Sequence, residues 1–222
     1  MRTIISGMTN SAGIRRGGTA GAAPGKRERL VEGAREVLHA QGVERTTLAD
    51  IAQAADVPVG NVYYYFKTKD ELVEAVVASR LAEMQAALQK LVQHRTPKAR
   101  LKAFVRMLTG QAELTAQFGC PQGSLCSELD KRADGPGSEC AELMRVPIAW
   151  AEEQFRAMGR RDAHELAVAL IASYQGIALL TNTEEVRQPV AIVVSHLSIG
   201  HRRDPLTRLA SADENASASH AL

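Results

Sequence analysis

The segment TTLADIAQAADVPVGNVYYYF, residues 46–66, decides the fold of this chain. Apolar residues at helical spacing follow Thr47, a typical N-terminal cap, and a second short helix is predicted to begin at Pro58. Between them Asp56 holds a turn position that requires a left-handed backbone, which Asp tolerates better than most residues. Two short helices joined by a tight turn are the layout of a helix-turn-helix, whose second helix enters the major groove of DNA.

The composition favours an all-helical protein with balanced charge. The chain has 222 residues, of which 45% are hydrophobic and 4% aromatic. Lys and Arg total 27 against 25 Asp and Glu, so any surface for nucleic acid must be local. Three cysteines form no disulfide framework and indicate a reducing compartment. We find no secretory signal and no apolar run of membrane-spanning length, so we expect a cytoplasmic protein with no membrane partner.

Helical periodicity continues on both sides of residues 46–66. We expect a helix over 26–41, stopped by Gly42, and a long helix from a Thr68–Glu71 capping box to about residue 94. Further helices are expected from residue 97 to the Gly-Cys-Pro corner at 119–121, over 123–132, over 138–158 with a bend at Pro147, over 163–180 and over 190–199.

These elements predict an all-α fold with a three-helix helix-turn-helix domain at the N-terminus and a larger helical domain behind it. We expect a disordered basic arm over residues 1–25, the DNA-binding domain over 26–72, the second domain over 73–204 and a disordered tail over 205–222.

The same motifs resemble the N-terminal domain of TetR/AcrR-family transcriptional repressors. The resemblance rests on Thr-Thr-Leu-x-x-Ile-Ala at 46–52, Val-Tyr-Tyr-Tyr-Phe at 62–66 and Lys-x-Lys-Asp-Glu-Leu at 67–72. The segment Gly-Cys-Pro-Gln-Gly-Ser-Leu at 119–125, followed by Glu-Leu at 128–129, is similar to an LmrA/YxaF-like subgroup. The resemblance implies a homodimeric repressor that binds a palindromic operator in double-stranded DNA and is released by a small-molecule inducer.

The chain departs from the family pattern at two positions. Asp56 stands where Gly is common, and Pro58 stands where Ser or a similar cap is common. Both residues are physically tolerable there, but Pro58 removes one hydroxyl that could contact a phosphate.

Eight residues are candidate DNA contacts: Thr47, Pro58, Val59, Gly60, Asn61, Tyr63, Tyr64 and Lys69. The hydroxyl and ammonium groups among them suit phosphate oxygens, whereas Val59 suits a thymine methyl group and Asn61 an adenine edge. Gly60 permits close approach of the helix to DNA. Strong base-specific donors are few, so we expect DNA shape to supply much of the specificity.

The second half of the chain is expected to receive a ligand and to form the dimer. Candidate pocket residues are Phe104, Met107, Leu108, Trp150, Phe155 and Tyr174, although ordinary core packing accounts for each of them individually. The apolar helices expected over 163–180 and 186–201 suit a two-fold interface, with the core of the monomer as the alternative.

An alternative function is a repressor that senses oxidants or electrophiles through Cys120, Cys126 or both. Simple burial of these cysteines is the competing explanation. The histidines and cysteines lack the spacing of metal ligands, so we expect no metal. Nucleophile elbows, phosphate loops and dinucleotide fingerprints are also missing, so we expect neither an enzyme nor a cofactor. Balanced charge argues against a non-specific architectural DNA binder.

Overall fold

The computed structural model describes residues 24–131 and 137–182, and this part of the chain contains helices and loops but no strand. The expected all-α class is confirmed. The expected arm up to residue 23, the helix expected over 186–201 and the tail after residue 205 lie outside the described residues. The described helices are α1 Lys26–Gln41, α2 Leu48–Ala54, α3 Val59–Tyr65, α4 Lys69–Leu91, α5 Pro97–Thr109, α6 Ala112–Phe118, α7 Pro121–Leu129, α8 Gly137–Ala157 and α9 Ala163–Asn182.

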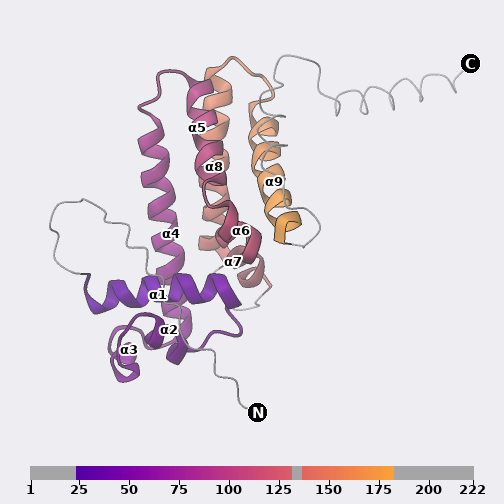
Figure 1. The fold of residues 1–222 in the computed structure, drawn as a ribbon. Coiled ribbons are helices and arrows are strands. Elements are labelled where there is room, and N and C mark those ends of the chain that lie inside the picture. The colour runs from indigo at the N-terminus through magenta and orange to yellow at the C-terminus, as the bar shows by residue number, and fades with distance from the viewer. Residues whose placement is uncertain (1–23, 132–136, 183–222) are drawn as a thin grey trace, which may run out of the picture.

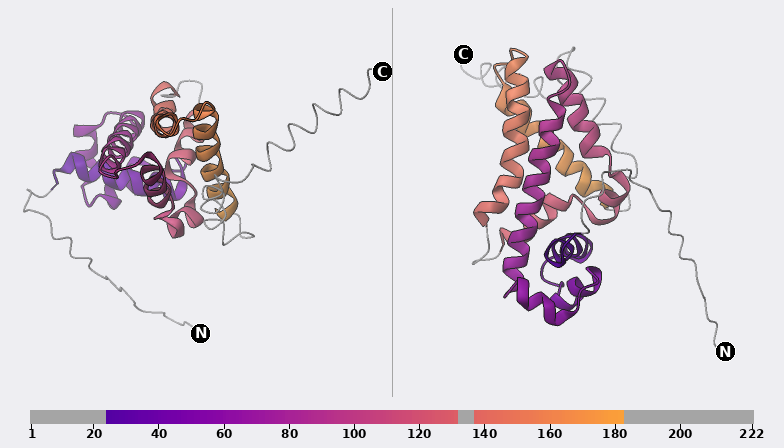
Figure 2. Two further views of the ribbon diagram at one scale, coloured as in Figure 1. Left: turned by 90° about the horizontal axis from the view of Figure 1, so that it is seen from above. Right: turned by 90° about the vertical axis from the view of Figure 1, so that its left-hand side faces the viewer.

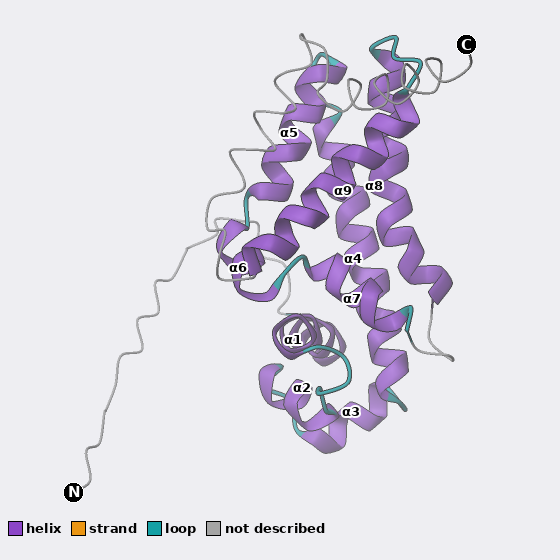
Figure 3. Cartoon of the chain, turned by 90° about the vertical axis from the view of Figure 1, so that its right-hand side faces the viewer, coloured by secondary structure: helices purple, strands orange, loops and turns teal. Residues whose placement is uncertain are grey.

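The helices form a small group at one end of the molecule and an upright bundle above it (Figure 1). Helix α1 crosses the base of the bundle, and α2 and α3 lie below α1 (Figures 1 and 3). Helix α4 begins in the lower group and continues upward beside α5 and α8, as the side view in Figure 2 also shows. The short helices α6 and α7 lie between α1 and the bundle (Figure 3).

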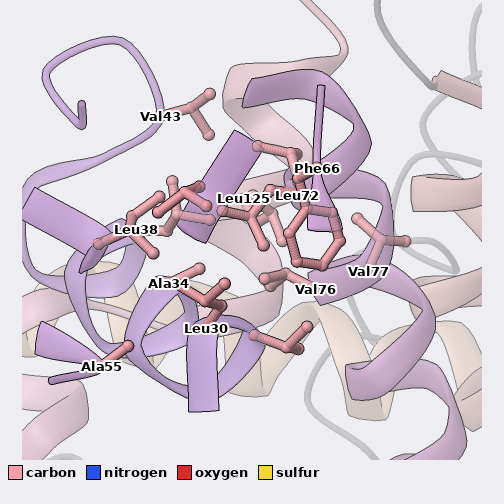
Figure 4. Packing of buried hydrophobic residues seen from close by; sticks show 14 of the residues in the cluster. Leu30, Ala34, Leu38, Val43, Ala55, Phe66, Leu72, Val76, Val77 and Leu125 are labelled. Atoms are coloured by element: carbon pink, nitrogen blue, oxygen red, sulfur yellow. The ribbon is translucent and has the colours of Figure 1, made fainter. Parts of the chain in front are cut away.

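Two clusters of buried side chains hold this arrangement together. The lower cluster joins α1, α2, α3 and the first turns of α4 around Leu30, Ile51, Val62 and Leu72, and Leu125 of α7 enters it (Figure 4). The upper cluster joins α4, α5, α8 and α9. Helix α4 contributes to both clusters, and its residues on either side of position 72 lie in the lower one. The domain boundary expected after residue 72 therefore falls inside the lower cluster and stays a proposal.

Caps fix most of the helix ends that the sequence predicts. Gly42 ends α1 with φ of +81°, a backbone conformation that favours glycine. Thr68 accepts a hydrogen bond from the Glu71 N–H at 3.1 Å, as expected for a capping box. The reciprocal bond differs, because the Glu71 carboxylate accepts from the N–H of Lys67 at 2.7 Å.

The region from 97 to 137 differs from the sequence-based expectation. The single helix expected from residue 97 to the Gly-Cys-Pro corner is divided into α5 and α6 at Gly110. Helix α7 begins at Pro121 rather than at residue 123, because the Cys120 thiol caps it by accepting the Gly123 N–H at 3.4 Å. Helix α8 continues through Pro147.

Helix α9 carries apolar side chains on its exposed surface as well as on its buried one. Val168, Leu179 and Leu180 are exposed, Leu179 by 67%. By length and composition alone, residues 163–181 are apolar enough to cross a membrane, contrary to the expectation from the sequence, and 28% of that window is buried. A core or interface helix of a soluble protein meets the same criterion, so this property does not by itself indicate a membrane.

Candidate nucleic-acid interface

Helix α3 presents an open outer face. Tyr64 is 77% exposed, Tyr63 53% and Val59 45%, and Pro58 and Gly60 are also exposed. A Cβ atom built on Gly60 would meet no atom within 4 Å. This face consists of hydroxyl, amide and small apolar groups, the kinds of group that contact phosphates and base edges.

The inner side of α3 is anchored in the lower cluster. Val62 is fully buried, Phe66 directly after the helix is 3% exposed, and Tyr65 packs against the cluster. The Arg27 guanidinium lies 5.1 Å from the centre of the Phe66 ring and covers it from α1. The expectation that Tyr65 and Phe66 are core residues is confirmed, and the consecutive tyrosines before them point outward.

The turn between α2 and α3 fixes the angle at which α3 is presented. Asp56 has φ of +50°, the left-handed conformation that the sequence predicts at this position. The Val57 N–H donates to the Ala52 carbonyl at 2.9 Å, and Arg29 of α1 donates to the Asp56 carbonyl at 3.1 Å. The basic start of α1 therefore stabilises the turn.

Thr47 caps α2, as the sequence predicts, but its donors are already engaged. Its hydroxyl donates to the Asp50 carboxylate at 2.7 Å and its backbone N–H donates to the same oxygen at 2.8 Å. These bonds, the hydroxyl bond above all, lower the pKa of Asp50. A direct bond from Thr47 to a phosphate would have to replace a bond to Asp50, so the structure places Thr47 in the cap.

Lys69 also points partly inward. Its ammonium donates to the carbonyls of Val43 at 2.8 Å and Thr46 at 3.2 Å, in the loop between α1 and α2. An ammonium has three donors, so one stays available for another acceptor. Lys67 donates to the Tyr63 carbonyl at 2.8 Å, at the end of α3.

The loop between α1 and α2 is held from the other side by residues that the sequence did not single out as functional. The Glu128 carboxylate of α7 accepts the Val43 N–H at 2.6 Å, and Lys69 donates to the Val43 carbonyl. The two side chains therefore bind both polar backbone groups of the same residue. Gly42 has φ of +81°, so any other residue would be strained here, and an added Cβ atom would also lie 2.8 Å from a Glu128 oxygen. Val43 and Glu128 are 85 residues apart in the sequence, and hydrophobic periodicity carries no signal for such a pair.

A second link joins α1 to the segment before α7. The Nε2 atom of His39 donates to the Gly119 carbonyl at 2.9 Å, and the His39 ring meets Phe118 edge-on at 5.5 Å between ring centres. Burial is the largest effect on His39 and lowers its pKa. The lower helices are therefore connected to α6 and α7 by specific polar contacts as well as by apolar packing.

The structure brings together five of the six residues proposed for a ligand pocket. Phe104 and Phe155 are buried in the upper cluster, and Met107, Leu108 and Trp150 pack against it. Phe104 and Trp150 have ring centres 5.2 Å apart. Tyr174 lies apart from this cluster, near Thr115 and Cys120, and burial raises its pKa. An open hollow of about 390 Å³ lies against α1 and the end of α2, and none of the six residues lines it.

The described part of the chain holds no group of three or more His, Cys, Asp or Glu residues that could bind a metal ion. Its three cysteines are thiols: Cys120 and Cys140 are buried and Cys126 is half-buried. Cys126 lies beside Cys140, a residue that the sequence analysis did not consider for redox chemistry.

Comparisons with known proteins agree with this geometry. Residues 30–76 match the family model described as "Bacterial regulatory proteins, tetR family". The transcriptional regulator BetI of Burkholderia ambifaria is 33% identical over 156 residues, which cover 69% of this chain and 80% of BetI. The transcriptional repressor DhaR of Mycobacterium sp. is 29% identical, over 74% of this chain and 86% of DhaR.

A TetR transcriptional regulator from Legionella pneumophila has a similar fold. Its crystal structure superposes with a TM-score of 0.70 at 18% sequence identity, over 80% of this chain and 97% of that one. The helix-turn-helix geometry, the family model and the identity to BetI over most of its length lead to one conclusion: this chain belongs to the TetR family of DNA-binding transcriptional regulators.

Proposed function

We propose that the protein is a homodimeric repressor that binds a palindromic operator through two copies of α3 and releases it when a small molecule binds the upper cluster. The observation that carries this proposal is the outer face of α3, where Val59, Gly60, Tyr63 and Tyr64 are exposed on a helix anchored from behind. Side chains that could have been buried are held toward solvent, which favours a contact with another molecule.

Within this face we assign two kinds of contact. The phenol groups of Tyr63 and Tyr64 donate to phosphate oxygens and fix the register. Val59 meets a thymine methyl group and half-buried Asn61 bonds an adenine edge, while Gly60 lets the backbone approach the groove. Pro58 begins α3 and sets its entry into the groove. At the edge of this face, Lys69 contacts phosphate through a donor that is not used in its bonds within the protein, and Thr47 does so in place of a bond to Asp50.

The dimer follows from the small size of one such face. A single helix of seven residues buries too little surface for a specific site, so two copies are required. The exposed apolar residues of α9, Val168, Leu179 and Leu180, supply a surface that a two-fold interface would cover. A palindromic operator is the DNA counterpart of that symmetry.

Release requires that the ligand prefer one of two arrangements of the dimer. We place the ligand among Phe104, Met107, Leu108, Trp150 and Phe155, where aromatic and flexible apolar side chains meet. The bonds from Glu128 to Val43 and from His39 to Gly119 give a movement of α6 and α7 a direct path to the helices below.

The test is selection of bound fragments from a random DNA pool, followed by the same selection with Asn61→Ala. The wild-type protein is expected to recover two inverted half-sites, and Asn61→Ala is expected to relax the preference at one base pair of each half-site by about 1–3 kcal/mol. Tyr64→Ala is expected to weaken binding to all selected sequences alike, with Tyr65→Phe as the control inside the core. Equal binding of the wild type to all fragments, or unchanged preferences in Asn61→Ala, would contradict the proposal.

A further inference from the structure

Cys126 of α7 and Cys140 of α8 bring their sulfur atoms within 3.1 Å of each other. The Cys126 thiol also donates to the Cys140 carbonyl oxygen at 3.1 Å, so two contacts fix the pair. A disulfide has its sulfur atoms about 2.05 Å apart, so a shift of about 1 Å would bring this pair to bonding distance. Two thiols held this close by the fold are prepared to form a bond with each other.

Helix geometry excludes the third cysteine, Cys120, as a partner of Cys126. Cys120 caps α7 and Cys126 lies six residues further along the same helix, about 9 Å away at the rise of an α-helix. Cα atoms more than about 7 Å apart cannot be bridged without moving the backbone. Cys120 and Cys126 are the candidates for redox sensing from the sequence, whereas the structure brings Cys126 together with Cys140.

The environment of the pair suits a reaction with a small oxidant. Cys140 is only 2% exposed, whereas Cys126 is half-buried and opens the pair to the surface. The hydrogen bond between the two sulfurs is the largest effect on both thiols: it lowers the pKa of Cys140 and raises that of Cys126. A thiolate is the nucleophile in thiol oxidation, and a thiolate at either position has the other sulfur 3.1 Å away.

We propose that Cys126 and Cys140 form a modification site at which a peroxide closes a reversible disulfide between α7 and α8. The thiolate of one of the two cysteines attacks one peroxide oxygen, the O–O bond breaks, and the departing hydroxide takes up a proton to leave as water. The sulfenic acid formed on that cysteine is then attacked by the sulfur of the other. The S–S bond forms, the S–O bond breaks and a second water leaves. The two sulfurs lose two electrons, which reduce the peroxide to two waters.

This bond would act on the helix that holds the loop between α1 and α2. Cys126 lies two residues before Glu128, whose carboxylate accepts the Val43 N–H at 2.6 Å. Drawing the Cys126 sulfur toward α8 moves α7, and the Glu128 bond depends on the position of α7. Oxidation at the pair therefore changes how firmly the loop at residues 42–47 is held.

The experiment treats the purified full chain with hydrogen peroxide and maps the product under non-reducing conditions. Cleavage after Lys131 separates the two cysteines, so a disulfide joins two tryptic peptides, and the intact protein loses two hydrogen atoms in mass. We expect this product in the wild type and in the matched control Cys120→Ser, and its loss in Cys126→Ser and Cys140→Ser. Added thioredoxin or dithiothreitol should restore both thiols.

Fragment-ion sequencing of the linked wild-type peptides decides the proposal even if a serine variant fails to fold, because it distinguishes Cys126 from Cys120, which lies in the same tryptic peptide. Addition of oxygen atoms to one cysteine without a linked peptide, a bond between two chains, or loss of the product in Cys120→Ser would overturn it. Amide hydrogen exchange of residues 42–47, measured without DNA, tests the link to the loop independently of the proposed function. A several-fold change on oxidation in the wild type supports the link, and equal exchange in both states contradicts it.

Discussion

At Gly33, where α1 packs on α2, an added Cβ atom would lie 2.9 Å from the Ala55 nitrogen, whereas at Gly60 on α3 it would meet nothing within 4 Å. The same residue type therefore serves two purposes within one helix-turn-helix. Gly33 lets two helices approach each other, and Gly60 leaves a surface unobstructed. The inner contact is completed by the protein itself, whereas the outer face is exposed to solvent.

Polar groups follow the same division. Thr47 is exposed but is bonded to Asp50, and the half-buried Lys69 donates to the carbonyls of Val43 and Thr46. On the outer face the phenol groups of Tyr63 and Tyr64 are directed to solvent. Hydrogen bonds within the domain thus engage Thr47 and Lys69, although their residue types alone suit phosphate contact equally well.

The largest expected effect is that of Gly33→Ala. The added methyl group would overlap the backbone of Ala54 and Ala55, which cannot move without displacing α2. We expect a net loss of about 2–3 kcal/mol in the free energy of unfolding, at the upper end of the cost of overpacking. Urea denaturation measures it, with Gly60→Ala as the matched control. An unchanged midpoint would show that the inner contact is not closely packed.

Lys69→Ala tests whether this residue mainly stabilises the fold or mainly contacts a phosphate. Loss of two charge-assisted bonds at a partly exposed site should lower the free energy of unfolding by about 1–2 kcal/mol. Lys67→Ala removes the same charge from the exposed end of α3 and should have little effect on stability. If Lys69 instead serves mainly a phosphate, stability is unchanged and the salt dependence of DNA binding falls by about one unit of slope.

This division explains which features the sequence could predict. The capping by Thr47 and the left-handed Asp56 depend on neighbours within a few residues, and the burial of Phe66 follows from its helical spacing with Val62; all three were predicted. The partners of Lys69, Glu128 and Cys126 depend on how distant helices pack. Periodicity determines which face of a helix is buried but not which side chain lies opposite, so these pairs become visible only in the structure.

The cap of α2 predicts a dependence of stability on pH. Because the pKa of Asp50 is lowered in the folded protein, its contribution is fully present above the ordinary value of 3.8 and is lost as pH falls through the lower native value. Thr47→Ala should cost about 1 kcal/mol at neutral pH. Thermal melting of the wild type and Asp50→Asn should differ at neutral pH and converge in acid. A constant difference would mean that the carboxylate charge contributes nothing to the cap.

The smallest expected effect on stability, and the one that probes the outer face directly, is that of Gly60→Ala. No atom opposes the methyl group, and alanine is the better helix former, so the free energy of unfolding should rise by about 0.5 kcal/mol. The same methyl group would occupy the space between α3 and a base edge, so operator affinity should fall while stability rises. Titration of selected operator DNA measures the affinity of the wild type and of Gly60→Ala, and urea denaturation measures their stability. Higher stability with unchanged affinity would place Gly60 outside the DNA contact, and the contrast with Gly33 would then rest on packing alone.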